Sequence, residues 1–121
     1  MALTKSNTVV ANNTTLTAGA GNVTSSDQVL TGNYQTIARI RFTNGATGPT
    51  IAAQCSVQIS EDTTSGDYMQ LALVSGGTTN SAVSEFVVYI PDAAEHMQFV
   101  SGSNTAQNVT LRIVTEQITA V

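Results

Sequence analysis

Apolar and polar residues alternate with a period of two along most of this chain. Because successive side chains of a β-strand point to opposite faces of a sheet, such alternation predicts a strand with one buried face. At residues 34–42 one face is predicted to hold Tyr34, Thr36, Ala38, Ile40 and Phe42, and the other face to hold Gln35, Ile37, Arg39 and Arg41.

The same pattern predicts further strands, and no window of helical length places apolar residues three and four apart. The expected strands are 51–60, 68–74, 84–90, 97–101 and 109–115, with shorter ones at 8–11, 14–17 and 28–30. Their inward residues include Ile51, Ala53, Cys55, Val57 and Ile59, and then Val109, Leu111 and Ile113, beside which Arg112 faces out. About seven to nine strands separated by turns predict an all-β fold, a single antiparallel β-sandwich that is immunoglobulin-like or a jelly-roll. The one helical candidate is a single turn at 92–95, which Asp92 would cap.

The first 28 residues differ in composition from the rest. Between residues 11 and 26 only Leu16 and Val23 are sizeable apolar residues, and a segment of small polar residues orders poorly by itself. We therefore divide the chain into residues 1–28, an N-terminal arm or a weak first hairpin, and residues 29–121, the β-sandwich domain.

Composition narrows the classes of partner. Charged residues make up 10% of the 121 residues, against a usual share of about 25%, and the formal net charge is -4. Nucleic acid binding relies on many Lys and Arg residues, so no nucleic acid partner is expected. The chain has no apolar run of membrane-spanning length and no signal-peptide core, so we expect no membrane partner and a soluble cytosolic product. With Cys55 alone, no internal disulfide can form.

Catalytic chemistry has few candidates. Cys55 shares a predicted inward face with Val57, which indicates a buried and inert thiol. His96 stands at the start of a strand, where a surface position is expected, and no other group forms a nucleophile and base pair with it. We therefore expect a protein that is not an enzyme and that needs no cofactor.

The sequence offers one acidic turn as a candidate metal site and three tyrosines as a candidate glycan site. Glu61, Asp62 and Asp67 could gather in one turn, but their spacing lacks the alternating ligands of a calcium loop, so no metal site is predicted. A glycan site would use aromatic platforms, for which Tyr34, Tyr68 and Tyr89 are the candidates, although packing on a sheet is their commoner role.

Arg39 and Arg41 are two of the four cationic residues of the chain and lie on one face of one predicted strand. Each could pair with a nearby carboxylate, Glu85 or Glu116 being outward candidates. The alternative is a pair of fixed donors for an acidic or carbonyl-rich partner surface, since Arg is enriched in protein interfaces.

A set of strand and turn motifs runs through residues 34–115. It comprises T-N-G with G-P soon after, an S-x-D hairpin followed by an aromatic residue, an I-P joint, and G-x-N-T-x-Q-x-V-T before the last strand. These motifs occur in RFTNGATGPT, EDTTSGDYMQL and FVVYIPDAAEHMQFVSGSNTAQNVTLRIV. They resemble the small β-sandwich virion proteins of tailed bacteriophages, of the head-decoration or cement type. The chain departs from the pattern at Tyr68, where Trp is expected, and at Gln98, where Arg is frequent.

The resemblance implies a structural protein that binds the outside of an assembled head and stabilises it by bridging capsid subunits. Its partner would be the major capsid protein, it would form a homo-oligomer such as a trimer, and it would move from the host cytoplasm to the capsid exterior. The turn at 76–81 would point outward. The expected partner-binding residues are Arg39, Arg41, Val9, Val10, Leu16 and Val23. The alternatives are a receptor- or glycan-binding module of a phage tail or surface adhesin, and a tail structural subunit.

Overall fold

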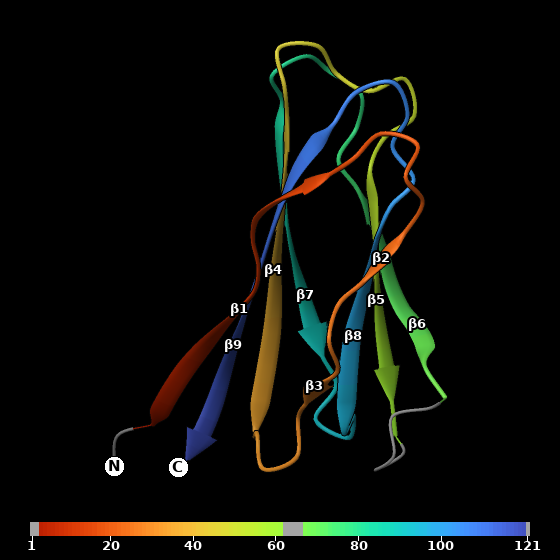
Figure 1. Cartoon of the computed structure of the whole chain (residues 1–121). Helices are drawn as coiled ribbons and strands as arrows, with labels where there is room; N and C mark the ends of the chain where they lie inside the picture. The colour runs from red at the N-terminus through yellow and green to blue at the C-terminus, as the bar shows by residue number, and fades with distance from the viewer. Residues whose placement is uncertain (1–2, 62–66, 121) are drawn as a thin grey trace.

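The computed structural model describes residues 3–61 and 67–120, and its regular structure consists of strands (Figure 1). The strands are β1 Thr4–Leu16, β2 Val23–Thr24, β3 Gln28–Val29, β4 Gln35–Asn44, β5 Gln54–Ser60, β6 Met69–Ser75, β7 Val83–Ile90, β8 His96–Gly102 and β9 Val109–Ala120. None of the described residues forms a helix long and apolar enough to cross a membrane.

The strands form two antiparallel sheets that pack face to face (Figure 1). One sheet has the order β1-β9-β4-β7, and the other has the order β2-β8-β5-β6, with β3 also paired to β8. The first strand pairs with the last, and successive strands mostly change sheet. This order is that of a jelly roll, in which two Greek keys close a double sheet, and it settles the choice between the two predicted topologies.

The core confirms the alternation predicted from the sequence. In β4 the residues Thr36, Ala38, Ile40 and Phe42 are buried, and between them Arg39 is exposed. The facing sheet contributes buried residues from β5 and β8, and β9 adds Val109, Leu111, Ile113 and Thr115. The largest of these buried residues are Phe42, Phe99, Leu16, Ile40, Met97, Ile113, Val57 and Val109. A largely apolar interior between the two sheets therefore accounts for the predicted strand faces.

Three local predictions were wrong. Ile51 is 55% exposed, because β5 begins only at Gln54 and Ile51 forms an isolated bridge with Thr105. Tyr34 is also exposed, since it precedes β4. The single helical turn at 92–95 is a tight turn, in which the Ala94 amide donates to the Pro91 carbonyl at 3.0 Å.

The N-terminal segment is part of the four-stranded sheet. Residues 8–11 and 14–17 were expected to be two short strands of an arm or weak hairpin, but residues 4–16 form the single strand β1 along β9. Its pairing shifts register between Val9 and Ala11 and again between Ala11 and Thr14. These bulges explain why the sequence pattern broke there, since each extra residue reverses the inward and outward alternation.

Candidate functional site: the outer face of the four-stranded sheet

Cross-strand register brings side chains of four strands into two rows on the outer face of the β1-β9-β4-β7 sheet. In one row Arg41 lies between Arg112 of β9 and Glu85 of β7. In the next row Arg39 lies between Val114 and Val87, and Val9 of β1 extends the row as the neighbour of Val114. We call the surface formed by Val9, Arg39, Arg41, Glu85, Val87, Arg112 and Val114 the arginine face.

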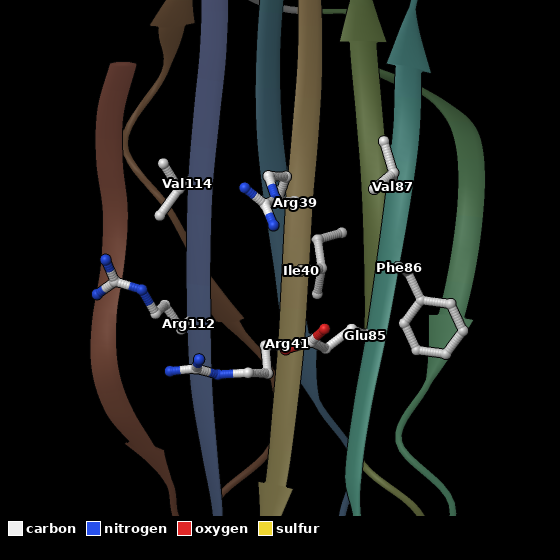
Figure 2. Close-up of a pocket in the computed structure, with 8 residues that line it drawn as sticks. All are labelled: Arg39, Ile40, Arg41, Glu85, Phe86, Val87, Arg112 and Val114. Atoms are coloured by element: carbon white, nitrogen blue, oxygen red, sulfur yellow. The ribbon is translucent and has the colours of Figure 1, made fainter.

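The arginine face is hollowed between its side chains. A hollow of about 470 Å³ is lined by Arg39, Ile40, Arg41, Glu85, Phe86, Val87, Arg112 and Val114 (Figure 2). Figure 2 shows the guanidinium groups of Arg41 and Arg112 both extending from their strands towards β1. The face thus offers two planar cationic groups above an apolar floor.

The arginines are held by different partners. Arg39 makes an ion pair with Glu116, with 3.2 Å between Nη1 and Oε1. Its side chain is 61% exposed, so solvent screening leaves this pair worth no more than about 1 kcal/mol. Arg41 donates from Nη2 to the Asn13 side-chain oxygen at 3.3 Å, and Arg112 donates from Nη1 to the Asn12 side-chain oxygen at 2.6 Å. Of the two predicted carboxylate partners, Glu116 is confirmed for Arg39.

The bulges in β1 position the two asparagines. Asn13 has a positive φ of 51°, a conformation that asparagine tolerates better than most residues. The extra residues of the bulged segment turn Asn12 and Asn13 towards β9 and β4, where their side-chain oxygens accept from the arginines. The only sequence signal for this arrangement is the adjacent pair Asn12 and Asn13 within a strand, since asparagine tolerates the left-handed conformation that a bulge can require.

Arg41 and Arg112 stand directly opposite each other, which places two like charges side by side. Like charges in such cross-strand pairs destabilise a sheet. Neutral asparagine oxygens orient the two guanidinium groups without neutralising them. One row of this sheet thus holds two guanidinium groups and a single carboxylate, that of Glu85. Guanidinium groups can bind carboxylates through two parallel hydrogen bonds.

Charge is segregated across the molecule. The four cationic residues of the chain, Lys5, Arg39, Arg41 and Arg112, all lie on the outer side of this sheet by register, and only Glu85 and Glu116 accompany them. That gives this side a net charge of +2, and five further acidic residues that the structure describes lie outside the strands of this sheet: Asp27, Glu61, Asp67, Asp92 and Glu95. An acidic protein therefore presents one basic face.

The residues predicted to bind a partner do not all lie together. Arg39, Arg41 and the half-exposed Val9 belong to the arginine face. Val10 packs against the core from the bulged part of β1, and Val23 is exposed on β2 of the other sheet. The prediction for Leu16 was wrong, because its side chain is 2% exposed and fills the core.

A polar cluster of Asp27, Tyr68 and the buried His96 joins three segments away from the arginine face. The Asp27 carboxylate accepts from the Tyr68 hydroxyl and lies 2.7 Å from Nδ1 of His96. Burial, followed by this hydrogen bond, raises the pKa of Tyr68 to about 12. His96 is 7% exposed, so the expected surface histidine is in fact a buried one. The cluster ties the segment before β3 to β8 and to the chain entering β6, which indicates a structural role.

Cys55 occupies the predicted interior position. It is fully buried in β5, and burial raises the pKa of its thiol to about 12. A thiol with such a pKa stays protonated and unreactive at neutral pH.

The described residues contain no group of three or more His, Cys, Asp or Glu side chains that could hold a metal ion. Of the acidic turn considered from the sequence, Asp62 lies outside the described residues. Tyr34 and Tyr89 are exposed, Tyr89 at 78%, whereas the hydroxyl of Tyr68 is engaged by Asp27.

The opposite sheet carries a different surface, which is uncharged. A hollow of about 280 Å³ is lined by Asn22, Gln54, Ser56, Gln58, Gln70, Leu73, Val100 and Ser103. Hydrogen bonds join the polar side chains of this surface. The Ser56 hydroxyl donates to the Gln70 side-chain oxygen at 2.9 Å, and the Gln98 amide donates to the Gln58 side-chain oxygen at 2.7 Å. We call this surface the glutamine face.

No protein-family model and no curated protein sequence matches this chain. Solved structures do resemble it. The PBSX exported protein XepA matches with a TM-score of 0.56 at 13% identity over 96% of this chain, which spans 37% of that one. The SPBc2 prophage-derived protein YomS matches with a TM-score of 0.50 at 11% identity over 96% of both chains. A Family 16 Carbohydrate Binding Module-2 matches with a TM-score of 0.51 at 14% identity over 80% of this chain and 70% of that one.

At these identities the similarity establishes the fold and nothing further. The chain is a β-sandwich domain of the kind found in prophage-derived proteins and in carbohydrate-binding modules. One of the three structures is named a carbohydrate-binding module, and a fold of this kind carries its function in surface sites.

Proposed function

We propose that this chain is a structural virion protein that decorates the outside of an assembled phage head and bridges capsid subunits through its arginine face. The observation that carries the proposal is the pair of guanidinium groups of Arg41 and Arg112, which stand opposite each other within a partly apolar surface. Arginine is enriched at protein interfaces, whereas lysine is depleted there. The complementary surface is an acidic patch on the major capsid protein.

Decoration requires binding and no chemistry. A protein that binds the assembled lattice and not its dissociated subunits stabilises the lattice by mass action. Many identical copies multiply weak contacts through avidity. The buried Cys55 and the buried His96 cluster serve the stability of the domain in this account.

The proposal is tested by occupancy on heads that lack the protein. Purified wild-type protein and the variants Arg41→Ser and Arg112→Ser are mixed with undecorated heads, and bound protein is measured after sedimentation. A charge-assisted contact contributes about 1.5–3 kcal/mol, so each variant should bind about tenfold to hundredfold more weakly. Arg112→Ser should change the free energy of unfolding little, because it removes a like-charge pair together with one exposed hydrogen bond to Asn12. Unchanged occupancy for both variants would refute the role of this face.

A second candidate function, binding of a neutral glycan, is favoured by the glutamine face. Its hollow is lined by amide and hydroxyl groups and by no charged residue, and such groups can exchange hydrogen bonds with sugar hydroxyls. One of the similar folds is named a carbohydrate-binding module. The variant Gln58→Ala tests this function. If the glutamine face binds a glycan, Gln58→Ala should be retarded less than the wild type in affinity electrophoresis through host polysaccharide. If the arginine face docks on heads, the same variant should occupy undecorated heads as the wild type does.

A further inference from the structure

β7 forms one edge of the four-stranded sheet and is regularly paired. Its register with β4 runs without a shift from Ile90 opposite Thr36 to Val83 opposite Thr43. Among the described strands, β7 pairs with β4 alone, and its other edge is open (Figure 1).

One hydrogen bond shows which backbone groups of β7 point towards β4 and which point towards the open edge. The Asn44 amide donates to the carbonyl of Ala82 at 2.9 Å, and these residues stand opposite each other just beyond Val83. Antiparallel pairs alternate between hydrogen-bonded and non-hydrogen-bonded positions. Even-numbered residues of β7 therefore bond to β4. The backbone groups of Val83, Glu85, Val87 and Tyr89 point to the open edge.

These same four residues bear the outward side chains of β7. Val83 is 57% exposed, Val87 53% and Tyr89 78%, and Glu85 is the only charged residue among them. Open, regular, apolar edges invite pairing with another strand, and proteins usually blunt them with charges or bulges.

The other edges within residues 3–61 and 67–120 are blunted. β1 carries Lys5 and is interrupted by register shifts, and β6 pairs with β5 through a shift at Val57 and Gln58. β2 and β3 are two residues long each. Among the described strands, β7 alone combines a regular backbone, an open edge and exposed apolar side chains.

We propose that a second copy of this chain pairs with this edge, β7 against β7, in an antiparallel two-fold dimer. A register centred on Phe86 places Val83 opposite the partner's Tyr89 and Glu85 opposite the partner's Val87, so all four open residues pair. A register centred on Glu85 would set two carboxylates against each other, which disfavours it. The strand is thus complementary to itself, as a two-fold interface requires.

The dimer would join the two four-stranded sheets into one continuous sheet. Because the two-fold axis stands perpendicular to that sheet, both arginine faces would lie on the same side. This pairing does not depend on the proposed decoration function, but it would give such a protein two equal docking faces at once.

The test measures the mass of the isolated protein by sedimentation equilibrium at concentrations up to about 1 mM. We expect a species of twice 12.5 kDa. Val87→Glu should weaken dimerisation about tenfold, because it sets a carboxylate opposite the partner's Glu85 at both symmetry-related positions. Tyr89→Lys should also weaken it, because a lysine on an edge strand disfavours pairing with another strand. The matched control is Val9→Lys, at a valine of similar exposure on β1, which should dimerise as the wild type does. A monomer at every concentration, or a dimer unaffected by both β7 variants, overturns the proposal.

Residue-resolved amide exchange separates β7 pairing from any other dimer. At high concentration the amides of Val83, Glu85, Val87 and Tyr89 should become protected, and they should lose protection on dilution. The even-numbered amides of β7 should be protected at all concentrations, since they bond to β4. A dimer in which the odd-numbered amides stay unprotected overturns the proposal.

Discussion

The substitution Gly76→Ala tests the packing between the two sheets. Gly76 follows β6 and lies over Phe42 of β4. A β-carbon added at Gly76 would stand 2.7 Å from Cβ and 2.9 Å from Cγ of Phe42. Both distances are shorter than real carbon contacts, so one of the two residues must move.

Neither residue can move cheaply. Phe42 is completely buried, and the Gly76 backbone is bonded on both sides: its amide donates to the Ala53 carbonyl at 2.9 Å, and its carbonyl accepts from the Ser84 hydroxyl at 2.9 Å. Overpacking of this kind costs about 1–3 kcal/mol. For a domain of this size we expect a fall in melting temperature of about 5–15 °C.

The matched control is Gly45→Ala. A β-carbon at Gly45 would meet nothing closer than the Thr47 carbonyl oxygen at 3.9 Å, so this variant should be neutral or slightly more stable. Thermal and urea unfolding followed by circular dichroism measure both variants. If Gly76→Ala were as stable as Gly45→Ala, the close approach of Gly76 to Phe42 would be wrong.

Three further predictions concern buried polar groups. With a thiol pKa of about 12, Cys55 should resist alkylation by iodoacetamide at pH 8 in the folded protein and react once guanidinium unfolds it; rapid labelling of the folded protein would contradict its burial. Asp27→Ala removes the acceptor shared by His96 and Tyr68 and should lower the free energy of unfolding by about 1–3 kcal/mol, and a neutral result in urea unfolding would argue against the cluster. Asn104→Ala should lower the free energy of unfolding by about 1–3 kcal/mol, because the buried Asn104 amide donates to two backbone carbonyls at 2.9 Å. A urea midpoint equal to that of the wild type would contradict those two hydrogen bonds.

Alternation made the sandwich predictable wherever a strand is regular. β4 and β9 keep a strict period of two, so their inward residues and the outward position of Arg112 could be read from the sequence. β1 could not be read in this way, because two bulges reverse the alternation and its exposed positions are mostly hydroxyl and amide residues. A strand whose partner lies about a hundred residues away leaves no local signal of that pairing.

Only part of the candidate site could be predicted, because the sequence pattern shows the faces of a regular strand but not which strands pair. Arg39 and Arg41 share a face within one strand, so the pattern predicted their common direction. Their junction with Arg112 and with the bulge asparagines depends on the register between strands, which the sequence does not state. The burial of His96 was missed because its partner Asp27 is distant in the sequence and comes close only through the pairing of β3 with β8.

The central claim is that the arginine face is the docking surface on an assembled head. Electron cryomicroscopy of heads reconstituted with the purified protein tests it most directly. We predict density for a β-sandwich at repeated capsid positions, with the outer side of the β1-β9-β4-β7 sheet against an acidic surface of the capsid protein. Bound protein with the arginine face turned to solvent, or heads that acquire no such density, would contradict it.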